Sequence, residues 1–215
     1  MGASRGHREC STRHTRLRWG AFCAFCAASL WSPSIEGEVR FDGTLRPENA
    51  GFVPGPAVGA PASSYRIEAE RGIQVGANLF HSFLRFDLAP GEGATFLAPT
   101  VPLAASIDRI LARVTGGQAS FIRGEIRSEL PGADLFLINP DGIAFGEGAS
   151  LSLSGSFHAT TADRVGLADG GAFDARHPSA SLLTMAPPSA FGFLADAPRP
   201  ISVDRAFLEI PFRNR

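Results

Sequence analysis

The side chains that could bind a metal or act in catalysis are few and scattered along this chain. Outside the first 31 residues the histidines are His81, His158 and His177, and no spacing among them matches that of metal ligands. Ser154 and Ser156 lack the flanking glycines of a nucleophile elbow. We therefore expect no metal and no cofactor.

Paired carboxylates are the other chemistry to consider, because enzymes that cleave polysaccharides use them. The acidic residues considered for such a pair are Asp87, Asp108, Asp134, Asp141, Asp163, Asp169 and Asp174. They form no motif, although stacked strands could bring two of them together. The sequence nominates no catalytic residue, and we expect a protein that is not an enzyme.

The first 31 residues have the form of a signal peptide. Five arginines up to Arg18 precede residues 19–31, an uncharged stretch too short to span a bilayer. We expect cleavage between residues 28 and 34. All three cysteines, Cys10, Cys23 and Cys26, lie in this segment, so the exported chain would fold without disulfides. The C-x-x-C at 23–26 lacks the βαβ context or second ligand pair that a redox or zinc site needs.

The rest of the chain reads as short strands between turns. It has 24 glycines and 16 prolines in 215 residues, and apolar residues alternate in Leu84-x-Phe86-x-Leu88 and Leu151-x-Leu153, as in strands with one buried face. The segment DLFLIN (134–139) is apolar on both faces, which is typical of a strand covered on both sides. This pattern predicts an all-β fold, either a sandwich or a β-solenoid. After residue 18 there are 15 arginines against 20 acidic residues, so we expect no nucleic-acid partner.

Two segments are less regular. Residues 32–64 read as loops with short edge strands. Residues 106–115 place apolar side chains at helical spacing after Ser106, a possible N-cap, and before Gly116, a possible stop. A short helix and a strand both remain open there.

Five motifs, taken in order, resemble a known family. They are DGTL (42–45), QVGANLFHSFLRFDL (74–88), RVTGG (113–117), PGADLFLINPDGIAFGEGASLSLSGSFHATTADR (131–164) and LLTMAPPSAFGFL (182–194). Together they resemble the N-terminal secretion domain of two-partner-secretion exoproteins of the filamentous-haemagglutinin type, also called the haemagglutination activity domain. The resemblance covers most of residues 42–210.

The resemblance implies a right-handed parallel β-helix with short extra-helical strands or hairpins over residues 32–210, followed by a tail at 211–215. It implies a non-enzymatic, monomeric module, secreted through the periplasm of a Gram-negative-type bacterium to the medium or cell surface. The implied partner is an outer-membrane β-barrel transporter with periplasmic recognition domains, and host or surface glycans are a further possible partner. The module would start export of an adhesin-type exoprotein and nucleate its β-helix outside the cell. A carbohydrate-active β-helix enzyme and a free-standing carbohydrate-binding adhesin are the alternatives.

Two stretches of the motifs are the candidate sites for partner recognition or for setting the fold. One is the turn Asn139, Pro140, Asp141, Gly142 and Ile143, and the other comprises Asn78, Leu79, Phe80, His81 and Phe83. The first has the residues of a type I turn. Read locally, it would close an antiparallel hairpin between DLFLIN and IAFG. In the resembled fold it is a corner, and we expect IAFG to pair with another segment.

Other details of the motif regions carry expectations. We expect a structural hydrogen bond at His81, and core positions rather than a sugar-binding surface for the phenylalanines Phe80, Phe83, Phe86, Phe191 and Phe193. Gln118-Ala119-Ser120 stands where relatives usually carry a proline, and Asp141 where asparagine is common. Residues 201–210 read as the start of another coil, after which the chain ends, so we expect a truncated or degenerate gene product rather than a secretion-domain-only product.

Overall fold

The computed structural model describes residues 37–55, 64–100, 105–194 and 197–209. The predicted signal peptide with its cysteines and the predicted tail at 211–215 lie outside the described residues. The described parts belong to one unit, Ile35–Arg215. They contain no helix that is long and apolar enough to cross a membrane.

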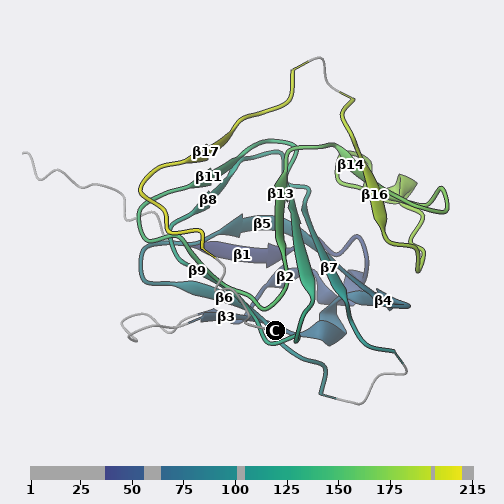
Figure 1. The fold of residues 1–215 in the computed structure, drawn as a ribbon, viewed down its shortest axis with the longest axis horizontal. Coiled ribbons are helices and arrows are strands. Elements are labelled where there is room, and N and C mark those ends of the chain that lie inside the picture. The colour runs from purple at the N-terminus through teal and green to yellow at the C-terminus, as the bar shows by residue number, and fades with distance from the viewer. Residues whose placement is uncertain (1–36, 56–63, 101–104, 195–196, 210–215) are drawn as a thin grey trace, which may run out of the picture. The chain divides into compact units, whose positions relative to one another are not determined.

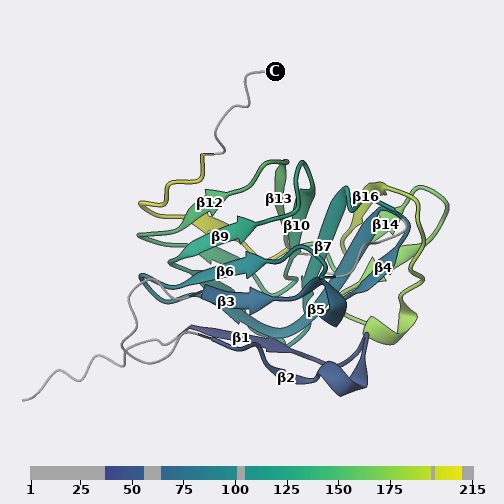
Figure 2. The ribbon, with the colours of Figure 1, turned by 90° about the horizontal axis from the view of Figure 1, so that it is seen from below.

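Most of the described strands lie in three parallel stacks. Stack A is β5 (Asn78–Asp87), β7 (Arg109–Val114), β10 (Asp134–Ile138) and β13 (Phe157–Thr160). Stack B is β3 (Ser64–Ile67), β6 (Gly93–Phe96), β9 (Glu125–Ser128) and β12 (Ser150–Ser152). Stack C is β8 (Ser120–Ile122), β11 (Ile143–Phe145) and β17 (Ile201–Val203). Figure 2 shows the strands of stack B side by side, and Figure 1 shows those of stack C.

The chain visits the stacks in a repeating order. It passes from B to A to C in β6, β7 and β8, again in β9, β10 and β11, and again in β12, β13 and β17. In the second passage the short turn Asn139–Gly142 connects stack A to stack C. In the third passage a long segment, residues 161–200, makes the same connection between β13 and β17.

That long segment and three other pieces pair antiparallel. The segment forms a sheet of β14 (Arg164–Leu167), β15 (Ala172–Asp174) and β16 (Pro188–Gly192), which we call the inserted sheet. Strands β1 (Glu38–Phe41) and β2 (Gly51–Phe52) pair with each other, and β1 also covers the edge of β5. Strand β4 (Ile73–Val75) pairs with the start of β5. Single-turn 3₁₀ helices lie at Pro47–Asn49, Ala69–Arg71 and Pro178–Ala180.

Strands β5, β7 and β10 of stack A bury both faces, as expected from DLFLIN. Leu135 and Leu137 belong to one apolar cluster, while Phe136 and Ile138 belong to a second that includes Val165 of the inserted sheet. A strand covered on both sides carries apolar residues at successive positions rather than alternate ones. The all-β prediction is confirmed.

Residues 109–114, left open as helix or strand, form the strand β7. Its two neighbours β5 and β10 supply backbone partners on both edges, and tertiary pairing outweighs the weak helical spacing. Ser106 does not cap a helix, because a strand follows it. Its Oγ instead donates to Asp108 Oδ1 at 3.0 Å. The region 32–64 contains β1, β2 and a 3₁₀ turn among its described residues, in line with loops and short edge strands.

Candidate functional site

Three of the sequence motifs meet at one partly buried carboxylate, that of Asp42. Asp42 of DGTL accepts hydrogen bonds from Ser82 Oγ at 2.6 Å and Thr115 Oγ1 at 2.7 Å. Ser82 belongs to the NLFHSFL stretch of β5, and Thr115 to RVTGG. Thr44 of DGTL also donates its backbone N–H and its hydroxyl to Asp42. Motifs far apart in the sequence therefore share one hydrogen-bond network.

Arg113 of β7 is the centre of this network, and its side chain is fully buried. Its Nε donates to Ser82 Oγ at 2.7 Å and its Nη2 to Thr44 Oγ1 at 2.8 Å. Its Nη1 donates to the carbonyl of Asp174 and to Ser181 Oγ, both at 2.6 Å. Arg113 thus bonds both the N-terminal DGTL segment and the inserted sheet.

The guanidinium of Arg113 also lies over an aromatic ring, with Cζ 4.3 Å from the centroid of Phe173. Burial lowers its pKa to about 10, against the opposing influence of Asp42 and Asp174. The side chain therefore keeps its charge at neutral pH. The charge is balanced by nearby carboxylates and satisfied by hydrogen bonds, as a buried cation requires.

Asn78, at the start of β5, holds the LLTMAPP segment. Its Nδ2 donates to the carbonyls of Thr184 and Ala186 at 3.0 and 2.7 Å, and the side chain is completely buried. The structure therefore places this candidate residue in a contact between two motifs more than 100 residues apart in sequence.

The turn at 139–142 is a corner between stack A and stack C. Gly142 N–H donates to Asn139 O at 3.1 Å, which closes the turn, and Asp141 N–H donates to Asn139 Oδ1 at 2.9 Å. Gly142 has φ +116°, a conformation that side chains with a Cβ rarely adopt. Ile143 begins β11, which pairs parallel with β8 and β17 and not with β10. The prediction that IAFG pairs elsewhere is confirmed, and Pro140 lies outside the strands.

Asn139 is fully buried. Its side-chain amide bonds this corner to the preceding connection between stack A and stack C, which runs from β7 to β8. Nδ2 donates to Gln118 O and to Ser120 Oγ, both at 3.0 Å. Gln118 is one of the residues that stand where relatives usually carry proline. Its backbone carbonyl is thus a structural acceptor for the turn.

Arg176 of the inserted sheet's connecting loop bonds the turn from outside. It pairs with Asp141 at 2.8 Å and with Asp163 at 2.9 Å, and its Nη2 donates to Pro140 O at 3.1 Å. Burial opposes the charge, but the hydrogen bonds to the two aspartates raise the pKa of Arg176. The carboxylate of Asp141, where relatives commonly have asparagine, therefore has a cationic partner.

We expect Arg176→Gln to lower the free energy of unfolding by about 1–2 kcal/mol, because it removes charged hydrogen bonds to Asp163, whose side chain is almost fully buried. Arg205→Gln is the matched control, since the ion pairs of Arg205 are with the exposed Glu147 and Asp204; we expect a loss of less than about 0.5 kcal/mol there. Urea unfolding of the two variants makes the comparison. Equal losses would contradict a structural role for Arg176.

The remaining candidate residues of β5 form core contacts. Leu79 and Phe83 belong to the larger apolar cluster and Phe80 to the cluster shared with the inserted sheet. Phe83 stacks on Phe41 at 4.9 Å between centroids. Of all ten candidate residues only Asp141 is not classed as buried.

Two sequence expectations about aromatic side chains are wrong. The predicted hydrogen bond of His81 is absent: neither ring nitrogen has a partner among the described residues, because the neighbours of the imidazole are apolar. Phe191 and Phe193 are about half exposed, since β14 is the one strand among the described residues that pairs with β16, which therefore lies at the edge of its sheet. Phe80, Phe83 and Phe86 are buried, as predicted.

The seven aspartates considered for catalysis serve other contacts. Asp141 and Asp163 are brought together, but on either side of Arg176. Others accept backbone N–H groups: Asp169 accepts that of Gly171 within a turn, and Asp134 of β10 accepts that of Ser156, which precedes β13. Among the described residues no group of three or more His, Cys, Asp or Glu is arranged to hold a metal ion.

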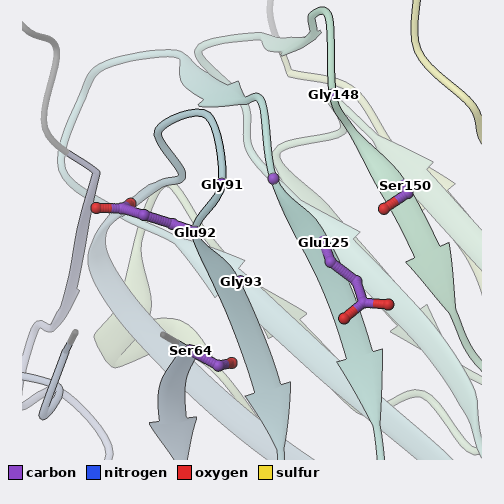
Figure 3. Close-up of a pocket in the computed structure, with 8 residues that line it drawn as sticks. Ser64, Gly91, Glu92, Gly93, Glu125, Gly148 and Ser150 are labelled. Atoms are coloured by element: carbon purple, nitrogen blue, oxygen red, sulfur yellow. The ribbon is translucent and has the colours of Figure 1, made fainter. Parts of the chain in front are cut away.

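A hollow of about 240 Å³ opens at the start of the strands of stack B and contains two glutamates that the sequence did not single out. Ser64, Glu125 and Ser150 are the first residues of their strands, and Glu92 precedes β6. Figure 3 shows the side chains of Glu92 and Glu125 pointing in different directions. Glu92 Oε2 accepts the backbone N–H of Ala89 at 2.9 Å. This arrangement differs from two carboxylates that face one another across a substrate.

Sequence reasoning missed Arg113 and Asp42 as the residues on which the motifs converge. The available signal was Arg113 itself, a charged residue between apolar residues of the strand RILARV. Arginine is almost never fully buried unless it is paired, so a buried partner could have been expected. Asp174 and Ser181 carry no such signal, because their contact with Arg113 depends on the placement of the inserted sheet.

The motifs lie within a region of the chain that matches a known protein family. The family model of the TPS secretion domain matches residues 50–203, which is most of the chain. No curated protein matches the chain. TPS secretion domains target two-partner exoproteins for secretion and are not a catalytic family, and their role implies interaction with an outer-membrane transporter. The chain belongs to the TPS secretion domain family.

Proposed function

We propose that this domain targets an adhesin-type exoprotein, of the filamentous-haemagglutinin kind, to its outer-membrane β-barrel transporter and then nucleates a right-handed parallel β-helix outside the cell. The route runs through the periplasm of a Gram-negative-type bacterium after removal of residues 1–31. The observation that carries the proposal is the match to the TPS secretion domain over residues 50–203.

The repeated order of strands supports the β-helix. Each passage through stacks B, A and C adds one parallel strand to each stack, so that neighbouring passages pair with one another. Phe207, after β17, forms a parallel bridge with Ser150 of β12, and its N–H donates to Ala149 O at 2.8 Å. The chain there returns to stack B, as the first strand of a further coil would. Local pairing of each coil with its predecessor suits folding from one end.

Burial of the motif residues bears on how the transporter would recognise them. In the folded chain Asn78, Phe80, Asn139 and Ile143 are inaccessible. We propose that the periplasmic domains of the transporter bind these segments before they fold, as extended strands added to a sheet edge. A chain without cysteine after residue 26 would not be locked by disulfides before that step.

A binding experiment tests this mode of recognition. The full chain is either diluted directly from urea into the purified periplasmic domains of the cognate transporter or first refolded and then mixed. Capture on immobilised periplasmic domains is measured. We expect capture of the freshly diluted chain and little capture of the refolded chain. Equal capture of both would show that a folded surface is recognised and would rule out recognition through the buried motifs.

A further inference from the structure

The imidazole of His81 lies in the apolar interior between stack A and stack B, surrounded by rings. Its centroid is 5.7 Å from that of Phe96, 6.0 Å from Phe83 and 6.1 Å from Phe41. The backbone of Gly72 closes a further side: a Cβ added there would lie 2.9 Å from His81 Cε1. The side chain has no solvent exposure.

Within the described parts of the chain, neither ring nitrogen has a hydrogen-bond partner. This distinguishes His81 from Asn78 and Ser82, which lie on the opposite face of β5 and whose buried polar atoms are all bonded. A neutral imidazole tolerates such a site at some cost, whereas an imidazolium would place an uncompensated charge in a low-dielectric interior.

The charged groups on the neighbouring elements do not compensate that charge. Arg40 of β1 and Asp42, directly after β1, flank Phe41. Asp42 bonds Ser82 and Thr115 in the network around Arg113. Arg71 is the last residue of the 3₁₀ helix Ala69–Arg71. Its Cζ lies 5.6 Å from the centroid of the Phe41 ring, and its guanidinium pairs with Glu68.

The other two neighbouring strands bring no counter-charge either. On β7 the residue in register with His81 is Ala112, and the adjacent Arg113 belongs to the network around Asp42. On β6 the contact is Phe96, and Thr95 beside it bonds Ser64. A carboxylate that could stabilise an imidazolium is therefore missing from these contacts of His81.

We propose that His81 makes folding of this domain a proton-releasing step, because the folded core accepts only the neutral imidazole. Mild acid then favours the unfolded chain, and neutral medium favours the folded one. The inference concerns folding alone and does not depend on the proposed role in export.

The direction of the pH dependence follows from the two end states. Burial lowers the pKa of His81 from 6.5 to about 3 in the folded chain. Between these values the unfolded chain binds more protons than the folded chain, so stability rises with pH. Stability is fully present above pH 6.5 and is lost progressively as the pH falls from 6.5 towards 3.

Urea unfolding of the full chain at pH 7.5 and 4.5 measures this effect, with His81→Phe as the test variant and His177→Gln, which removes an exposed imidazole, as the matched control. We expect the folding equilibrium constant of the wild type to fall on the order of 100-fold more than that of His81→Phe over this range. The buried Asp87, whose pKa is raised by burial, and the exposed Glu70 and Asp169, whose pKa values are lowered by hydrogen bonds, are present in all three proteins. Their contributions cancel in the comparison. An equal fall in His81→Phe would overturn the proposal.

A second measurement needs no variant. In the folded wild type, NMR of the histidine ring signals should show one imidazole that stays neutral down to pH 4.5. If every histidine ring of the folded chain titrates above pH 5, His81 is not the proton-releasing group and the proposal is wrong.

Discussion

Replacing Arg113 with methionine is expected to lower the free energy of unfolding by about 3–5 kcal/mol. Methionine fills part of the volume of the stem but removes the charge and every donor. The buried Asp174 and the partly buried Asp42 then lose the nearby cation, and the carbonyl of Asp174 loses its donor. Removing one partner of a buried charge network costs far more than replacing the whole network with apolar groups, because the other charge is left uncompensated. Urea unfolding at pH 7 measures the loss.

Arg109→Met is the matched control for Arg113→Met. Arg109 lies on the same strand, is only partly buried, and makes a long contact of 3.4 Å to Asn78 Oδ1. We expect a loss below about 1 kcal/mol for this variant. Similar losses for the two variants would contradict the assignment of Arg113 as the centre of the network.

The second large effect is expected for Asn139→Leu, which should lower the free energy of unfolding by about 2–4 kcal/mol. Leucine has a similar volume, but it leaves Gln118 O, Ser120 Oγ and the N–H of Asp141 without the partners that Asn139 supplies. Each buried group left unsatisfied costs about 1–3 kcal/mol, reduced where water reaches it. Thermal and urea unfolding both measure this loss.

Asp141→Asn in the same turn provides the comparison. The amide keeps the shape of the side chain and removes only the charge that pairs with Arg176, whose side chain is about one-third exposed. We expect a loss below about 1 kcal/mol. If Asp141→Asn is as damaging as Asn139→Leu, the turn is held by its outer ion pair and not by the buried amide.

Local patterns were sufficient to predict much of this fold. DLFLIN is apolar at successive positions because both faces of β10 are covered, and INPDG contains the residues that a tight turn requires. The parallel pairing of β11 was predictable only through the family resemblance. Local chemistry alone equally favours an antiparallel hairpin at that turn, and the choice depends on which strands lie beside it.

The features that the sequence left open or that were predicted wrongly have a common physical origin, since they concern neighbours that are distant in sequence. The spacing in residues 106–115 fits a helix, and only the edges of β5 and β10 make it a strand. His81 carries two polar atoms, so a partner was expected, but Phe41, Phe83 and Phe96 surround it instead. Phe191 resembles a core residue until β16 is known to be an edge strand.

Secretion of the full chain shows whether its export depends on a dedicated transporter. The chain is expressed in a bacterial host with its cognate two-partner outer-membrane transporter, with an unrelated outer-membrane β-barrel, or with neither. The amount of chain in the medium is measured against a periplasmic marker that reports leakage. We expect the chain to reach the medium only with its cognate transporter and to remain in the periplasm otherwise. Equal amounts in the medium under all three conditions, without leakage of the marker, would contradict it.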